Sequence, residues 1–250
     1  MIVITGATGT LGQLVVEEAL KVFPASEIGV SVRDTSKAAH LAAQGVSVRE
    51  GDFKKPETLT TAFNGADQLV VISGNGQGDE LVQAHNNVIN AAKEAGVSRL
   101  LYTSQIGSSP ASYFQPMVDH FKTEELLDQS GLNFVSLRHG FYSASGQFFF
   151  SIGIKDGALR LPKNGPINWT THEDLAQGLV AILQDESFDQ QLPVLTSARA
   201  LTMEEIAQEY TQETLTRVVI SDEEFYEQLN AIPNLPEEQK KCLLISSMQV

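Results

Sequence analysis

A glycine-rich segment near the N-terminus constrains the fold of this 250-residue chain more than any other feature. Residues 6–12, GATGTLG, follow the apolar run 1–5, which predicts a buried strand, and precede a segment whose apolar residues at 11, 15 and 19 predict an amphipathic helix. A glycine turn at a helix N-terminus offers backbone N–H groups to an anion and leaves room for a phosphate. Its G-x-x-G-x-x-G spacing is a variant of the dinucleotide fingerprint, with a purely structural turn as the alternative. We therefore expect a dinucleotide to bind at Gly6, Ala7, Thr8, Gly9, Thr10, Leu11 and Gly12.

The first 140 residues continue as alternating strand-like and helix-like segments. Strands are predicted at 28–32, 46–48, 68–72, 99–103 and 134–137, and helices at 37–43, 56–63, 81–95 and 121–129. Apolar strands separated by helices indicate a parallel sheet covered on both faces, which binds ligands beyond the carboxyl ends of its strands. The predicted fold class is α/β, with a doubly wound Rossmann sheet in residues 1–145, to which later segments return. Residues 146–250 are expected to form a small α/β lobe on the substrate side, with short strands near 159–162, 193–195 and 217–220.

The composition excludes several classes of function. With 17 basic and 31 acidic residues, the net charge of −14 repels nucleic-acid phosphates and anionic membranes, so we expect neither as a direct partner. No apolar run approaches the ~20 residues of a membrane span. The single cysteine, Cys242, allows neither an internal disulfide nor a cysteine-based metal site, and no acidic cluster accompanies the histidines, so no metal is expected. Because the first strand begins at the N-terminus, the sequence leaves no room for a signal peptide and favours a reducing cytoplasm.

The end of the second predicted strand indicates which nicotinamide cofactor is preferred. Arg33 follows the strand directly and Lys37 lies about one helical turn later. A cation there matches the 2′-phosphate of NADP, whereas a carboxylate would bind the ribose hydroxyls of NAD. We therefore expect NADPH. Two alternatives stay open: Asp34 would face the ribose if the strand ended one residue later, and Arg33 could be a solvated loop residue.

Other strand ends supply further candidate cofactor contacts. Asp52 and Phe53 could border the edge and face of the adenine, although Asp52 is equally suited to a turn. Ser73 and Gly74 would let the chain pass close to the cofactor ribose, or form a plain loop. Around the ends of the next two strands, we expect contacts to the cofactor from Thr103, Ser104, His139, Gly140 and Phe141.

The usual acid catalyst of short-chain dehydrogenases, which share this glycine spacing, is missing. None of the ten lysines has a tyrosine four residues before it, and Tyr113 is followed by Met117 at the lysine position. Oxidation of an alcohol would therefore lack its usual base. Either the chemistry needs no strong proton-transfer partner, or the domain senses its cofactor without catalysis.

Several segments together resemble one branch of that superfamily. They are 4–9 (ITGATG), 32–33 (VR), 41–45 (LAAQG), 85–93 (HNNVINAAK), 102–104 (YTS), His120 with 123–124, and Arg138 with Gly140 and Tyr142. In this order they are similar to the NmrA-like atypical short-chain dehydrogenases, and within them to bacterial NADPH:quinone oxidoreductases of type 2 and triphenylmethane reductase. The resemblance implies a Rossmann domain that binds NADPH and a small lobe over a substrate pocket. His139 replaces an asparagine common in the family, which also usually continues for some tens of residues beyond Val250.

Hydride transfer to a quinone or a similar aromatic acceptor needs little beyond positioning and the exclusion of water. Phe141, Tyr142 and Phe148–Phe150 are expected to line the acceptor pocket. The alternative for Phe148–Phe150 is that they pack the lobe interface. His120 takes the place of a lysine in related reductases and could donate a hydrogen bond to the developing quinone oxyanion. His120 and Tyr142 are thus the candidate catalytic residues, with a structural histidine as the alternative. The predicted function is an NADPH-dependent quinone oxidoreductase; the alternative is a non-catalytic NADP(H) sensor that acts through a protein partner.

Overall fold

The computed structural model describes residues 1–155, 157–212, 215–235, 237 and 240, and within them not the side chains of residues 147–149, 151 and 210. Cys242 therefore lies outside the described residues. The chain divides into two compact units. Unit 1 comprises Met1–His139 and His172–Leu195, and unit 2 comprises Gly140–Thr171 and the residues from Thr196 onward. Residues 172–195 thus return to the first unit after the chain has entered the second.

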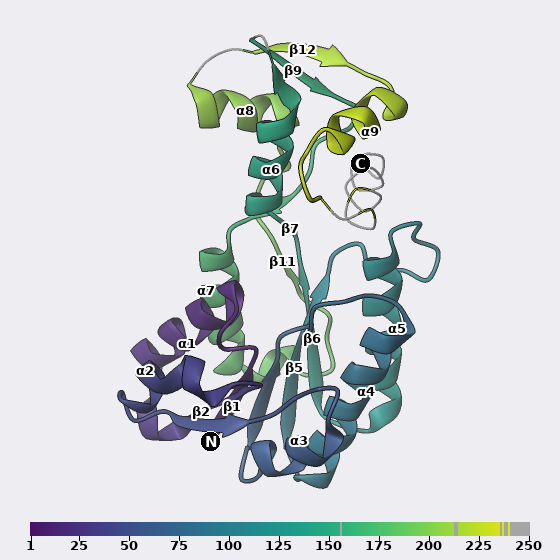
Figure 1. The fold of residues 1–250 in the computed structure, drawn as a ribbon. Coiled ribbons are helices and arrows are strands. Elements are labelled where there is room, and N and C mark those ends of the chain that lie inside the picture. The colour runs from purple at the N-terminus through teal and green to yellow at the C-terminus, as the bar shows by residue number, and fades with distance from the viewer. Residues whose placement is uncertain (156, 213–214, 236, 238–239, 241–250) are drawn as a thin grey trace. The chain divides into compact units, whose positions relative to one another are not determined.

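Unit 1 is built on a seven-stranded parallel sheet (Figure 1). Its strands are β1 (Ile2–Thr5), β2 (Ile28–Val32), β3 (Ser47–Glu50), β4 (Gln68–Val71), β5 (Arg99–Gln105), β6 (Phe134–His139) and β11 (Val194–Leu195). Their order across the sheet is β11-β6-β5-β4-β1-β2-β3. The direction of winding reverses between β1 and β4, and a ligand binds beyond such a switch point in sheets of this kind. The predicted doubly wound parallel sheet is confirmed.

Helices cover both faces of this sheet. They are α1 (Thr10–Val22), η1 (Ala25–Glu27), η2 (Thr35–Ala38), α2 (Ala39–Ala42), α3 (Pro56–Phe63), α4 (Asp79–Glu94), α5 (Gln115–Ser130), α7 (His172–Leu183) and η3 (Glu186–Phe188). Helix α1 packs against α7, while α4 packs between α3 and α5 (Figure 1). Helix α5 begins six residues before the predicted 121, because Pro116 is tolerated in a first helical turn.

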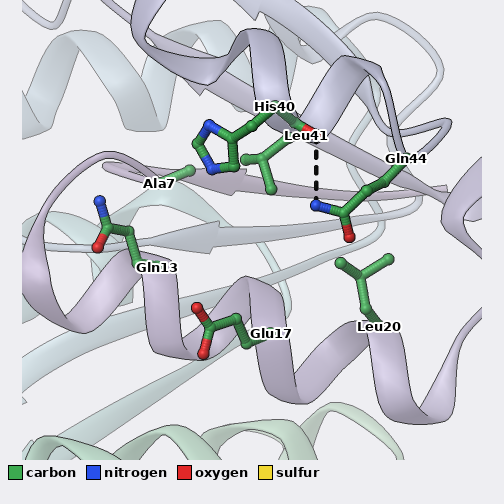
Figure 2. A pocket seen from close by; sticks show the side chains of 7 residues that line it. All are labelled: Ala7, Gln13, Glu17, Leu20, His40, Leu41 and Gln44. Atoms are coloured by element: carbon green, nitrogen blue, oxygen red, sulfur yellow. Dashed lines mark hydrogen bonds between the residues drawn. The ribbon is translucent and has the colours of Figure 1, made fainter.

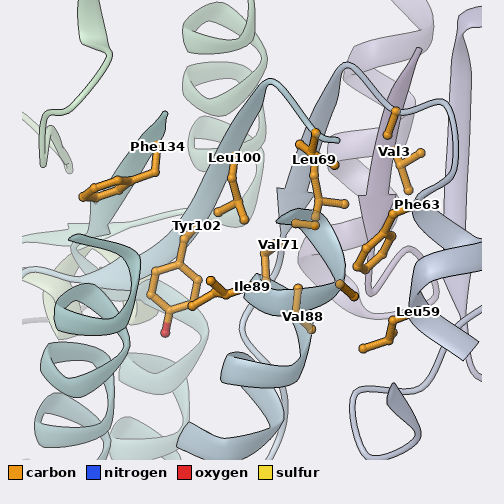
Figure 3. Packing of buried hydrophobic residues seen from close by; sticks show 14 of the residues in the cluster. Val3, Leu59, Phe63, Leu69, Val71, Val88, Ile89, Leu100, Tyr102 and Phe134 are labelled. Carbon is orange, nitrogen blue, oxygen red and sulfur yellow. The ribbon is translucent and has the colours of Figure 1, made fainter. Parts of the chain in front are cut away.

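One hydrophobic core of unit 1 lies where α3 and α4 cover the sheet (Figure 3). Helix α4 buries one face because its apolar side chains recur at helical spacing, as Leu81, Ala84, Val88 and Ala92 do. The strands contribute continuous apolar runs, as expected for a parallel sheet covered on both sides. This packing fixes the carboxyl ends of the strands in space.

Unit 2 contains shorter elements around a second core. They are β7 (Phe141–Tyr142), α6 (Ser143–Gly153), β8 (Ile154–Lys155), β9 (Ala158–Leu161), β10 (Trp169–Thr170), α8 (Met203–Thr211), β12 (Thr216–Val219) and α9 (Asp222–Asn230). Strand β7 pairs with β10, and β9 pairs with β8 and β12. The sequence did not predict α6, because its small first residues show no helical periodicity. Gly146 lets this helix approach Trp169 closely, since an added Cβ would lie 3.3 Å from the Trp169 ring.

Candidate functional site

The glycine turn lies between β1 and α1 and leaves the helix N-terminus open. Gly6 has a positive φ of 64°, and the N–H of Gly9 donates to its carbonyl over 2.9 Å. Gly12 brings the helix against the turn, because an added Cβ would lie 2.1 Å from the Gly6 oxygen. A Cβ on Gly9 would meet only that same oxygen, at an ordinary 3.4 Å. The N-cap residue Gly9 provides no side-chain cap, so the first N–H groups of α1 remain for an anion, and the turn fits the pyrophosphate of a dinucleotide.

The segment that follows β4 lies beside this turn and is held by side chains of neighbouring strands. Thr5 accepts a hydrogen bond from the N–H of Ile72 over 3.0 Å, and Thr103 accepts one from the N–H of Ser73 over 2.9 Å. A Cβ added to Gly6 would lie 3.3 Å from that of Ile72, so the two loops are in contact at the switch point. The structure thus brings the predicted residues Gly6 and Ser73 together, and gives the Thr103 hydroxyl a role in the scaffold.

A buried histidine of α4 completes this support. His85 is 1% exposed, and its Nε2 accepts from the N–H of Gly74 over 3.1 Å. Its Nδ1 lies 3.0 Å from the hydroxyl of Thr123, which itself donates to the Asp119 carbonyl. These roles assign the hydrogen of His85 to Nδ1. Burial lowers the pKa of His85 to about 3, with a smaller contribution from His120, so the ring is neutral.

The end of β2 separates the roles of the two charged residues that follow it. Strand β2 ends at Val32, and Asp34 caps η2 by accepting from the N–H and hydroxyl of Ser36 over 3.0 and 2.6 Å. These hydrogen bonds lower the pKa of Asp34. Arg33 is exposed and makes no hydrogen bond or ion pair within the described part of the chain. Exposed Lys37 lies close by in η2. Asp34 is thus occupied in a turn, whereas Arg33 has its guanidinium available.

Phe53 lies beside the segment after β4, whereas its neighbour Asp52 belongs to a turn. The Asp52 carboxylate accepts from the N–H of Lys54 over 3.0 Å, so it stabilises the turn before α3. The half-buried Phe53 ring packs edge to face on His85, with centroids 6.2 Å apart. A Cβ added to Gly74 would lie 3.6 Å from the Phe53 ring. Phe53 and Gly74, predicted from different strand ends, are therefore neighbours.

The row of rings continues across the sheet edge to the candidate catalytic histidine. His85 and Tyr102 have centroids 5.4 Å apart, and Tyr102 and His120 have centroids 5.8 Å apart. The Tyr102 hydroxyl lies 2.8 Å from Nδ1 of His120. Burial raises the pKa of Tyr102, and burial lowers the pKa of His120 to about 4 against the opposing carboxylates of Glu124 and Asp119. Both groups are therefore neutral near pH 7.

His120 is half-buried, and its Nε2 has no hydrogen-bond partner among the described residues. Nε2 is also not fully buried, because it is absent from the buried polar atoms that have no partner. This edge of the imidazole is therefore accessible, as a group that contacts a substrate must be.

A buried carboxylate beneath His120 was missed by the sequence reasoning. Glu124 accepts hydrogen bonds from Ser104, Ser108 and Ser136 over 2.8, 2.8 and 2.9 Å. Arg138 adds two, from Nε over 3.0 Å and from Nη2 over 2.7 Å. Burial alone would raise the pKa of Glu124, but these donors hold it below its ordinary value. The four-residue spacing of His120 and Glu124 on α5 was the available signal. The Ser104 hydroxyl is thereby committed to the scaffold.

The remaining predicted residues lie around the boundary of the two units in sequence. His139 ends β6 and is fully buried, and burial lowers its pKa to about 3, with smaller contributions from His120 and His172. Gly140 and Phe141 belong to unit 2, where the N–H of Phe141 donates to the Asn168 carbonyl over 3.0 Å.

The predicted aromatic pocket is only partly described. Tyr142 lies in β7 of unit 2, and the Phe141 ring packs edge to face on Trp169 with centroids 6.2 Å apart. Phe150 is 1% exposed and belongs to the core of unit 2, where it packs rather than lines an open surface. The side chains of Phe148 and Phe149 lie outside the described residues. A role for Phe141 and Tyr142 at the acceptor stays a prediction.

A small hollow adjoins the glycine turn between α1 and α2 (Figure 2). It is lined by Ala7, Gln13, Glu17, Leu20, His40, Leu41 and Gln44. Figure 2 shows the His40 ring directed toward Ala7, and the Gln44 amide donates to the His40 carbonyl over 3.3 Å. Among the described side chains, no group of three or more potential metal ligands gathers here or elsewhere. No described helix is both long enough and apolar enough to cross a membrane.

Comparison with known proteins agrees with the geometry of the turn. A family described as NAD(P)H-binding matches residues 6–186. The chain belongs to this NAD(P)H-binding family. It is 35% identical over 241 residues to quinone oxidoreductase 2 of Escherichia coli strain K12, covering 93% of this chain and 82% of that protein.

Two solved structures of oxidoreductases share the fold of this NAD(P)H-binding protein. The NADPH-dependent quinone oxidoreductase of Escherichia coli, complexed with NADPH, matches with a TM-score of 0.90 and 31% identity over 99% of this chain and 88% of that chain. The Citrobacter triphenylmethane reductase, complexed with NADP(H), matches with a TM-score of 0.87 and 31% identity over 99% of this chain and 89% of that chain. These matches confirm the predicted resemblance to NmrA-like quinone oxidoreductases and triphenylmethane reductase, and the chain is an oxidoreductase of this group.

Proposed function

We propose that this chain transfers a hydride from NADPH to a quinone or a similar conjugated aromatic acceptor. The observation that carries the proposal is the open N-terminus of α1 at Gly9, beside a free Arg33 and a committed Asp34. A guanidinium without a protein partner suits the 2′-phosphate that distinguishes NADPH from NADH. The acceptor class is proposed from the quinone oxidoreductases that the chain resembles.

The residues of unit 1 supply the binding and orientation that this reaction needs. Bound NADPH would supply the hydride from its nicotinamide ring. The N–H groups that follow Gly9 would hold the pyrophosphate, and Arg33 with Lys37 would hold the 2′-phosphate. The segment 72–74 is fixed by three side chains, so it can border the ribose without reorganising on binding. Phe53 is proposed as a further cofactor contact. His139 is fully buried, so its predicted contact with the cofactor stays a prediction from the sequence.

His120 is the proposed donor to the acceptor. Its Nε2 edge is accessible, and a quinone oxygen gains negative charge as the hydride arrives. A donor that meets charge only in the transition state raises turnover more than it strengthens ground-state binding. The missing Tyr-x-x-x-Lys arrangement fits this chemistry, because solvent can deliver the proton after hydride transfer. Tyr142 is the second proposed catalytic residue, and Phe141 a proposed apolar contact.

Aerobic consumption of NADPH by the purified full chain, with and without a small quinone, tests the proposal. We expect quinone-dependent turnover that falls in His120→Ala by more than NADPH affinity falls. Glu125→Ala, an exposed position on the same helix, is the matched control and should leave both quantities unchanged. NADPH binding without turnover on any quinone would instead favour a sensor that acts through a protein partner. Action in a reducing cytoplasm, without nucleic acid, stays a prediction from composition.

A further inference from the structure

Tyr102 is placed where it can act on His120 but not on a substrate. It lies on β5 and is 1% exposed, with its ring packed in the hydrophobic core near Ile89 of α4 (Figure 3). Its hydroxyl leaves that core and meets Nδ1 of His120 over 2.8 Å. A side chain so deeply buried cannot touch an acceptor molecule. Any part that Tyr102 plays in the reaction must therefore pass through the imidazole.

We propose that Tyr102 is a positioning residue that holds His120 in the tautomer with its hydrogen on Nε2, the edge that faces the acceptor. The inference rests on the proposed function, in which that edge donates to the acceptor oxygen. A neutral imidazole has one donor and one acceptor nitrogen, so a hydroxyl that donates to Nδ1 leaves the hydrogen on Nε2. Without that hydroxyl, the imidazole would populate both tautomers, one with its hydrogen on Nδ1 and one with its hydrogen on Nε2.

The surrounding groups favour the phenol as the donor in this bond. An imidazole nitrogen accepts hydrogen bonds more strongly than a phenol oxygen. The hydroxyls of Thr123 and Ser73 also approach the phenol. Thr123 could only accept there, because it already donates to the Asp119 carbonyl, and its oxygen is also paired with Nδ1 of His85. Nδ1 of His120 is therefore the stronger acceptor for the phenol hydrogen. The raised pKa of Tyr102 and the lowered pKa of His120, both caused by burial, keep the hydrogen on the phenol oxygen.

Among the residues that the structure describes, no titratable neighbour competes with Tyr102 for Nδ1. The groups that face the imidazole are Glu124 and Asp119 of α5, His85 of α4 and His139 of β6. Both carboxylates are engaged elsewhere, Glu124 with serines and an arginine, and Asp119 with the N–H of residue 78 and the amide of residue 115. His85 directs its own nitrogens to residues 74 and 123. Tyr102 is thus the group that decides which nitrogen of His120 is protonated.

The test compares Tyr102→Phe with Tyr113→Phe in the full chain labelled with 15N-histidine. Tyr102→Phe removes only the hydroxyl and keeps the ring that fills the core. Tyr113 is 89% exposed, so Tyr113→Phe is the matched control. Long-range 1H–15N spectra report the tautomer of His120, whose signals are assigned by their loss in His120→Ala. Turnover with NADPH and a small quinone is measured on the same samples, together with NADPH affinity and the melting temperature.

We expect the wild type and Tyr113→Phe to show His120 with its hydrogen on Nε2. Tyr102→Phe should show both tautomers and about tenfold lower turnover, the equivalent of one lost hydrogen bond, with NADPH affinity unchanged. A wild-type spectrum with the hydrogen on Nδ1 would overturn the inference, as would full turnover in a folded Tyr102→Phe. If the wild type reduces no quinone, the proposed function fails by itself, and the spectra still decide whether Tyr102 sets the tautomer of His120.

Discussion

Acid should destabilise unit 1 at a pH where most proteins are still stable, because the unit buries three neutral histidines. Burial lowers the pKa values of His85, His120 and His139 to about 3, 4 and 3, from an ordinary value of 6.5. At a pH between the folded pKa values and the ordinary value of 6.5, these histidines bind protons in the unfolded chain but not in the folded chain. The stability contributed by the neutral rings is therefore complete above pH 6.5 and is lost as the pH falls toward the folded values.

The size of the loss follows from proton linkage. Each such histidine lowers the free energy of unfolding by about 1.4 kcal/mol per pH unit below 6.5. Lowering the pH from about 7.5 to about 5.5 should therefore lower the free energy of unfolding by about 4 kcal/mol in total. Because pH 5.5 lies more than one unit above all three folded values, this figure does not depend on their detail. His85 and His139, which are both buried, account for about two-thirds of this figure, and His120, which keeps part of its ring in solvent, for at most the remaining third. A loss of this size is a large part of the ~5–15 kcal/mol that stabilises a typical domain.

Urea unfolding at several pH values, followed by far-UV circular dichroism and by hydrogen exchange in β5 and β6, measures this loss. Fluorescence is unsuitable, because the only tryptophan, Trp169, lies in unit 2. His85→Gln should lower the pH dependence by about a third, whereas His40→Gln, at an exposed position on α2, is the control and should retain it. A wild-type stability that changes by less than ~1 kcal/mol between these pH values would refute the reasoning.

Three further predictions concern the turn, the cofactor and the buried ion pair. Gly9→Val should fold and lose NADPH binding in a fluorescence titration, and unchanged NADPH affinity would remove the turn from the site. Gly12→Ala should instead lower the melting temperature, because its Cβ would overlap the turn. Arg33→Ala should weaken NADPH by tenfold or more, about 1.5–3 kcal/mol, with little effect on NADH; equal loss of both cofactors would contradict a role at the 2′-phosphate. Glu124→Gln should destabilise the protein by about 3 kcal/mol in urea, since it leaves the half-buried Arg138 without its counter-charge; a change below ~0.5 kcal/mol would count against a structural ion pair.

The parts of the fold that depend on local pattern could be predicted from the sequence. Strand β2 and helix α3 have the predicted bounds, because continuous apolar residues define the strand and Pro56 suits a first helical turn. The edge of the sheet that carries the site followed from the same pattern, because all parallel strands end on it. The availability of Arg33 rather than Asp34 at this edge required one further fact, that Asp34 caps η2.

The hydrogen-bond networks could not be predicted in this way. His85 bonds to residues 11 positions before it and 38 positions after it, and Glu124 collects donors from β5, β6 and the loop after β5. Only the folded sheet brings such residues together, and no local spacing records it. Tyr102 illustrates the same limit. The strand that contains it was predicted, but its contact with His120 appeared only in the structure.

The position of a polar residue at a strand end does not by itself assign it to the ligand. Thr103 and Ser104 both lie at the predicted edge, yet one holds the N–H of Ser73 and the other the carboxylate of Glu124. A hydroxyl engaged in this way fixes the backbone and has less capacity left for a ligand. Under the proposed function, discrimination between ligands depends on groups without a partner among the described residues, the guanidinium of Arg33 and Nε2 of His120. The two sets of groups therefore complement each other. The hydrogen bonds of the scaffold fix the edge of the sheet, and the donors without a partner can then meet a ligand at that fixed edge.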